Sequence, residues 1–147
     1  MAEWTDLYRS VVLPQYCDHY GHMNVRFYVQ CFDDCGFHMW NLAGVNIPEQ
    51  NAKGIGLVIA NISVNFHHEI TSGSMLLIKG AWTKVGNRSV TYEQRLYNAD
   101  TGVLCASQES VEVFFDTEAR KAMDMPDDLR KAVTAALISP EAYDDKT

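Results

Sequence analysis

One long apolar helix followed only by strands is the feature of this sequence that most constrains its fold. Apolar residues recur every three or four positions from Val25 to Ala43, which predicts a helix of about 19 residues. Asn24 can cap its N-terminus and Gly44 can end it. Because the repeat is unusually apolar and aromatic, we expect much of the helix surface to be covered by the rest of the chain; its members are Val25, Tyr28, Val29, Phe32, Gly36, Met39, Trp40 and Ala43.

After the helix the hydrophobic period becomes two, which predicts strands. The first of these has one apolar face, formed by Val58, Ala60, Ile62, Val64 and Phe66. Three more strands, separated by turn sequences, predict an antiparallel meander over residues 75–84, 89–98 and 103–115. A short strand at 8–13 precedes the long helix, and a last helix runs from Pro126, at its first position, to about Ile138.

This order of elements predicts an α+β fold in which a curled antiparallel sheet wraps around one central helix, with a further helix at the C-terminus. A chain of 147 residues suits a single domain over 1–147, with frayed ends at 1–6 and 139–147. Such a sheet leaves apolar surface and edge strands uncovered. We therefore expect a homodimer or homotetramer.

The composition excludes several classes of function. The net charge of −7 leaves no basic surface for nucleic acid. No stretch approaches the ~20 apolar residues of a membrane span, and the polar start Met1–Asp6 lacks a secretory leader, so we expect a cytoplasmic protein. The four cysteines should be reduced and packed, because their spacing matches no zinc or redox motif.

The residues that could take part in catalysis lie just before the long helix. Asp18, Gly21, His22 and Asn24 fall within seven residues. A helix N-terminus offers unpaired N–H groups and a partial positive charge, which can stabilise a carbonyl oxygen that becomes anionic during attack. A nearby carboxylate can attack that carbonyl or deprotonate a water that does so. Gly21 permits the tight turn that would bring Asp18 back towards the helix.

This segment resembles the hotdog-fold thioesterases of the 4-hydroxybenzoyl-CoA thioesterase class. Their motif, close to Asp-x-x-Gly-His-(Met/Val)-Asn with Tyr four residues later, stands here as Asp18, Gly21, His22, Met23, Asn24 and Tyr28. Residues 66–73 and 85–89 resemble later landmarks of the class, so that the likeness extends over nearly the whole chain. The sequence Gly-His-Met-Asn is especially similar to that of the branch that includes betainyl-CoA thioesterases.

The resemblance implies hydrolysis of an acyl-CoA thioester to a free acid and CoASH. Asp18 would be the nucleophile or general base, and the backbone N–H of Val25 would polarise the thioester carbonyl. His22, Asn24 and Tyr28 would complete the site. No cofactor is implied, since coenzyme A is part of the substrate.

Simpler interpretations stay open for these residues. Asp18 can be a turn residue, His22 a structural histidine and Asn24 only a helix cap. His67 and Glu69, at the end of a strand, can border the acyl pocket. A metal site is not expected there, because His67 and the adjacent His68 would point to opposite faces of the strand.

Coenzyme A phosphates require local cations in so acidic a protein. Lys84 and Arg88 lie around a Gly-Asn turn, and Arg26 lies at the second helical position. Each can bind phosphate or simply face solvent.

Two other functions compete with thioester hydrolysis. The spacing of Asp18 and His22 also permits an acyl-CoA hydratase or dehydratase of the same fold. A non-catalytic acyl-CoA binder would keep the helix N-terminus and turn over nothing. The identity of the acyl group is left open by the sequence.

Overall fold

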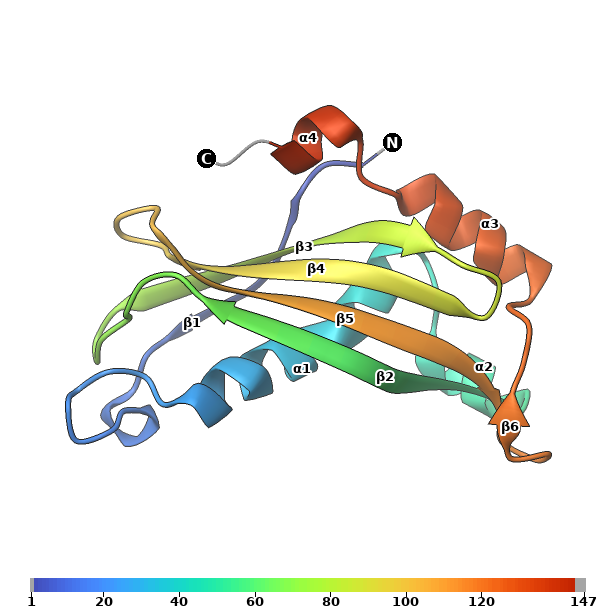
Figure 1. Cartoon of the computed structure of the whole chain (residues 1–147), viewed down its shortest axis with the longest axis horizontal. Coiled ribbons are helices and arrows are strands. Elements are labelled where there is room, and N and C mark those ends of the chain that lie inside the picture. Colours follow the sequence, from blue (N-terminus) through green and yellow to red (C-terminus); the bar gives the residue numbers. More distant parts are fainter. Residues whose placement is uncertain (1, 145–147) are drawn as a thin grey trace.

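A curled antiparallel sheet and one long helix dominate the computed structural model, which describes residues 2–144. The strands are β1 Thr5–Val11, β2 Ile55–Phe66, β3 Met75–Val85, β4 Ser89–Asn98, β5 Leu104–Asp116 and β6 Lys121–Ala122. The helices are η1 Pro14–Tyr16, α1 Val25–Leu42, α2 Ile47–Ala52, α3 Asp127–Ala136 and α4 Pro140–Asp144. The sheet has the order β1-β3-β4-β5-β2, with β6 paired to β5, and it curls over α1 (Figure 1). The predicted α+β fold is confirmed.

Helix α1 begins and ends where the sequence predicts. The side chain of Asn24 accepts a hydrogen bond from the N–H of Arg26, and Gly44 follows the helix with a φ of +73°. One side of α1 packs into the core through Tyr28, Phe32, Cys35, Met39 and Trp40. The opposite side is less covered than we expected: Val25 and Phe37 are 60% and 62% exposed.

Strand β2 departs from the single apolar face that the sequence indicates. A β-bulge lies at Ala60, where Ile59 pairs with Glu112 and the next paired residue is Asn61. A bulge inserts one residue and reverses the alternation of side chains. Residues 57 and 59 therefore face α1 before the bulge, and residues 62, 64 and 66 face it afterwards. The predicted face was wrong for Val58 and Ala60.

The meander β3-β4-β5 is confirmed, since each strand pairs with the next. Helix α3 is shorter than predicted, with Pro126 as its N-cap. It stops at Ala136 because the N–H of Ile138 donates to the carbonyl of Trp82 on β3. Helix α2 and the short elements η1, β6 and α4 were not predicted. Within residues 2–144, no helix is long and apolar enough to cross a membrane.

The prediction of frayed ends was wrong for the described residues. Thr5 and Asp6 begin β1, and residues 140–144 form α4. The two ends hold each other on the outer face of the sheet: Trp4 donates to the carbonyl of Ala142, and its ring stacks on Tyr143 at 5.9 Å. Arg95 of β4 lies over the Trp4 ring at 4.0 Å. Residues 1 and 145–147 lie outside the described part of the chain.

Apolar side chains stay exposed along α1 and β2. We call this surface the α1–β2 face; it consists of Val25, Phe37, Ile59, Ile62 and Phe66, each more than 40% exposed. Strand β2 is also an edge of the sheet, and no strand among the described residues pairs with its outer side. An apolar patch beside an unpaired strand edge is typical of a surface that another chain covers.

Among residues 2–144, one acid is buried in the core: Glu112 of β5, which is 7% exposed. Its carboxylate accepts a hydrogen bond of 2.8 Å from the indole N–H of Trp40 on α1. Burial raises the pKa of Glu112 to about 7, and the charge of Asp33 adds to the rise, while hydrogen bonds from Trp40 and Tyr92 partly oppose it.

This raised pKa makes stability depend on pH. Because the folded chain holds the Glu112 proton more tightly than the unfolded chain, the free energy of unfolding should fall as the pH rises from the ordinary 4.5 through about 7. In the unmodified protein the free energy of unfolding should fall by about 2 kcal/mol between pH 5 and pH 8, and Glu112→Gln should abolish this fall. Urea unfolding of both proteins at these two pH values measures the difference. Parallel pH profiles for the two proteins would contradict the assignment.

Candidate active site

The loop before α1 is folded back on itself, with Asp18 at its start. The N–H of Asp18 donates to the carbonyl of His22, and Gly21 makes the reversal possible with a φ of +80°. The Asp18 Oδ1 atom accepts hydrogen bonds from the N–H groups of Tyr20, at 2.9 Å, and His22, at 3.3 Å. Within residues 2–144, Oδ2 has no hydrogen-bond partner. The predicted tight turn at Gly21 is confirmed, and one carboxylate oxygen is left available for chemistry.

The N-terminus of α1 has an open donor. Asn24 caps the N–H of Arg26 at 3.3 Å and its carbonyl accepts from Phe27, but the N–H of Val25 makes no hydrogen bond in the described chain. Val25 is 60% exposed, so that a ligand can reach this group. An unpaired N–H at the positive end of an 18-residue helix is suited to a carbonyl oxygen that gains negative charge.

A cavity of about 300 Å³ opens beside this helix end. It collects five residues that the sequence proposed for the site: His22, Val25, Tyr28, His67 and Glu69. Met23, Phe66 and His68 complete its lining. The ring of Tyr28 is 4% exposed and meets Phe66 edge-on at 5.2 Å. Burial raises the pKa of Tyr28 to about 12, so that its hydroxyl is neutral.

Two histidines of the cavity have partners of their own. Nε2 of His22 lies 3.1 Å from Oε2 of Glu69. Nε2 of His67 lies 3.0 Å from the hydroxyl of Ser107 on β5. The His22 ring is therefore held by Glu69, and Asp18 contacts only the backbone of His22. The side chains of Asp18 and His22 are therefore not paired with each other.

The remaining predicted residues lie outside the cavity lining. Asp18 is half-buried in the adjoining loop, and two hydrogen bonds with the backbone of His22 connect it to the cavity lining. The guanidinium of Arg26 lies 4.9 Å from the ring of Phe27. Asn24 acts as the helix cap, which supports the simpler of its two interpretations.

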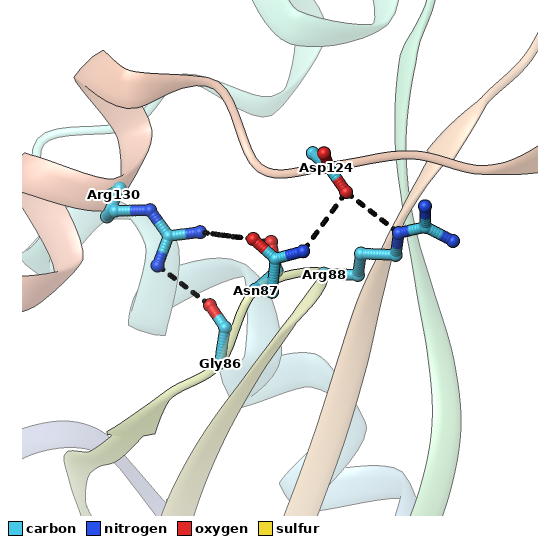
Figure 2. Close-up of polar contacts among 5 residues, drawn as sticks. All are labelled: Gly86, Asn87, Arg88, Asp124 and Arg130. Carbon is cyan, nitrogen blue, oxygen red and sulfur yellow. Dashed lines mark hydrogen bonds and ion pairs between the residues drawn. The ribbon is translucent and has the colours of Figure 1, made fainter.

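Lys84 and Arg88 lie at the other end of the sheet in the same chain. Strand β3 starts beside the Asp18 loop and reaches the hairpin eleven residues later, which is about 30 Å of strand. Arg88 Nε lies 2.8 Å from Oδ1 of Asp124, which also accepts from Asn87 (Figure 2). Arg130 donates to the carbonyls of Gly86 and Asn87. The hairpin is thus fixed against α3 and the segment before it.

The pairing of His22 with Glu69 was not found from the sequence, although both residues were singled out. It depends on a β-bridge between His22 and Thr71, which joins two loops about fifty residues apart. No periodicity signals such a contact. The only sequence indication was the concentration of polar groups at the end of β2.

A curled antiparallel sheet wrapped over one long helix is the architecture of the hotdog fold. The chain belongs to the thioesterase-like superfamily, whose family model matches residues 12–133. A betainyl-CoA thioesterase of Pseudomonas aeruginosa is 22% identical over 76% of this chain and 70% of its own. The chain is an acyl-CoA thioesterase, and the predicted enzyme class is confirmed.

Solved structures share the fold across most of their length. A 1,4-dihydroxy-2-naphthoyl-CoA thioesterase from Synechocystis superposes with a TM-score of 0.75 at 16% identity, over 86% of this chain and 93% of that one. A Staphylococcus aureus protein solved in complex with CoA superposes with a TM-score of 0.81 at 15% identity, over 100% and 97% of the two chains. At these identities the likeness concerns the fold.

Proposed function

We propose that this thioesterase hydrolyses its substrate with Asp18 as the nucleophile or general base. The observation that carries the proposal is the unpaired N–H of Val25, which opens on a cavity next to the Asp18 loop. The thioester carbonyl oxygen would accept a hydrogen bond from this N–H. Its carbon would then be attacked by Asp18 Oδ2, or by a water that Asp18 deprotonates, and the thiolate of coenzyme A would leave. In the first case a water molecule would hydrolyse the resulting acyl–Asp18 anhydride, which releases the free acid and restores the carboxylate.

We further propose that the protein acts as an assembly of at least two copies joined through the α1–β2 face. The exposed edge of β2 can pair with β2 of a second copy in antiparallel orientation, which extends the sheet and covers the apolar side chains of both chains. Antiparallel pairing brings the N-terminal half of one β2 beside the C-terminal half of the other. The hairpin of one copy would then lie at the same end as the Asp18 loop of the other.

The proposal for the acyl group rests on the relative named above. The Pseudomonas aeruginosa relative acts, by its name, on betainyl-CoA. We propose a small betaine-like acyl chain as the substrate class. Assaying CoASH release against a panel of betainyl, short-chain, branched and aromatic acyl-CoAs tests this. Release from none of them, with hydration or simple binding instead, would refute hydrolysis.

Coenzyme A phosphates are expected to meet Arg88 of the second copy. Arg88→Ala should raise KM for acyl-CoA, through a loss of about 1–3 kcal/mol of binding free energy, and should change kcat little. The reason is that phosphate binding is shared by the ground state and the transition state. An N-acetylcysteamine thioester, which lacks phosphates, is the control substrate and should be indifferent to the substitution. An equal effect on both substrates would mean that Arg88 acts through its contact with Asp124 on the fold.

A further inference from the structure

A second cavity of about 300 Å³ lies farther along α1, between this helix, α2 and the inner faces of β2 and β5. It is lined by two carboxylates, Asp33 and Glu112, and by three aromatic rings, those of Phe37, Trp40 and Tyr92. The mechanism proposed above uses none of these residues. Gly36 allows the hydroxyl of Tyr92 to lie close to α1, because a Cβ at this position would be only 3.2 Å from that hydroxyl.

The charge of this cavity is not balanced within the chain. Glu112 is 7% exposed and accepts one hydrogen bond from Trp40, and the negative charge of Asp33 lies close enough to act on it. Among the described residues, neither carboxylate forms an ion pair with a lysine, arginine or histidine. A buried carboxylate without a cation is unfavourable, so that a cationic ligand would be attracted to this position.

The walls select the kind of cation. A primary ammonium needs hydrogen-bond acceptors on several sides, whereas a quaternary ammonium donates no hydrogen bond and is bound by aromatic faces and nearby negative charge. Phe37 is 62% exposed at the mouth of the cavity, and Trp40 and Tyr92 lie buried deeper in it. Three rings with two carboxylates match a trimethylammonium group.

The position of the cavity relative to the reacting thioester depends on the second copy. Along one α1, Asp33 is eight residues from Val25, which is about 12 Å of helix. In a betaine-like acyl group the nitrogen is only two bonds from the carbonyl carbon, so that the cavity of the same chain is out of reach. However, Leu57 and Ile59 of β2 line this cavity, whereas Phe66 of β2 lines the one at the helix N-terminus. Antiparallel pairing of two β2 strands brings these two cavities together.

We infer that this second cavity holds the trimethylammonium group of a betaine-like acyl chain whose thioester lies at the α1 N-terminus of the other copy. The inference rests on the proposed function. It assigns Asp33, Trp40, Tyr92 and Glu112 to substrate specificity and Asp18 and Val25 to the reaction, with each active site built from two chains.

Specificity is tested with an uncharged isostere, because 3,3-dimethylbutyrate has the shape of glycine betaine without its cationic charge. By isothermal titration, glycine betaine should bind at least about tenfold more tightly than the isostere. Glu112→Gln and Asp33→Asn should each remove most of this preference, and Asp33, on the exposed side of α1, can be changed without disturbing the core. Asp34→Asn, which changes the next residue on α1 and lies outside the cavity lining, is the matched control. Equal binding of the two probes by the unmodified protein would overturn the inference.

The same comparison in turnover separates this inference from the proposed function. Glu112→Gln should lower the ratio of kcat/KM for betainyl-CoA to kcat/KM for 3,3-dimethylbutyryl-CoA at least about tenfold. If both thioesters are hydrolysed equally well by the unmodified protein, the enzyme is a thioesterase and only the cation site is wrong. If neither is hydrolysed while glycine betaine still binds through Glu112, the cation site stands and the proposed reaction fails.

Mixed assemblies test the contribution of two chains to one site. The Asp18→Asn and Glu112→Gln proteins should each be poor on betainyl-CoA. After they are unfolded and refolded together, a mixed dimer contains one site with Asp18 from one chain and Glu112 from the other, both intact. Activity should rise to about a quarter of the unmodified level, since random pairing makes half of the dimers mixed and each of these has one intact site. No gain on mixing would place both groups in the same chain and contradict the inference.

Discussion

Replacing Asp18 by asparagine is expected to lower kcat for acyl-CoA hydrolysis at least about a hundredfold, which is the typical loss when a positioned general base is removed. The amide can still accept the hydrogen bonds from Tyr20 and His22 that hold the loop. The fold should therefore persist, as circular dichroism and thermal unfolding can check. Steady-state assay of CoASH release measures the effect.

The chain provides a matched control for this experiment. The carboxylate of Asp116 also accepts two backbone N–H groups, from Glu118 at 3.0 Å and Ala119 at 2.9 Å, but it lies in a turn after β5. Asp116→Asn removes the same charge from the same kind of turn and should leave turnover unchanged. If the two variants behave alike, Asp18 is a turn residue and its chemical role is wrong.

The largest loss of stability is expected at Trp82, the centre of the core around the C-terminal half of α1. Its ring is 1% exposed and meets Trp40 at 4.8 Å and Tyr92 at 5.2 Å. Its indole N–H donates to the carbonyl of Met39 on α1 at 3.2 Å. Trp82→Ala removes this packing and this hydrogen bond and opens a cavity. We expect the free energy of unfolding to fall by about 3–5 kcal/mol.

Trp4 is the control for this second substitution. It stacks on Tyr143 and under Arg95, outside the core. Trp4→Ala should cost only about 1 kcal/mol. Denaturant unfolding of both variants gives the two values, provided that the slope of the transition is unchanged. Similar losses for the two would mean that the aromatic cluster around Trp82 does not dominate the core.

The elements that could be predicted are those determined by local pattern. Helix α1 has a clear period, a capping asparagine and a terminating glycine, and the meander strands alternate between turn sequences. The bulge at Ala60 could not be predicted, because Val58 and Ala60 fit an unbroken strand equally well. It is imposed by pairing with β5, about fifty residues away.

The same division holds for the site. Asp18, Gly21 and Asn24 are neighbours in the sequence, and their arrangement follows from a turn and a helix start. The contact of His22 with Glu69 and the meeting of Asp33 with Glu112 exist only after distant segments have docked. The proposed contact of Arg88 with coenzyme A requires a second chain, whose position the sequence of one chain does not specify.

The two chain ends contact each other, and this contact matters for any attempt to shorten the protein. Trp4 and Ala142 are separated by 138 residues in the sequence and are joined by a hydrogen bond, so that the two ends are part of the folded unit. They cover Arg95 and Glu93, whose side chains are 11% and 15% exposed and form an ion pair of 3.5 Å. Trimming either end would therefore open the outer face of β4 to water.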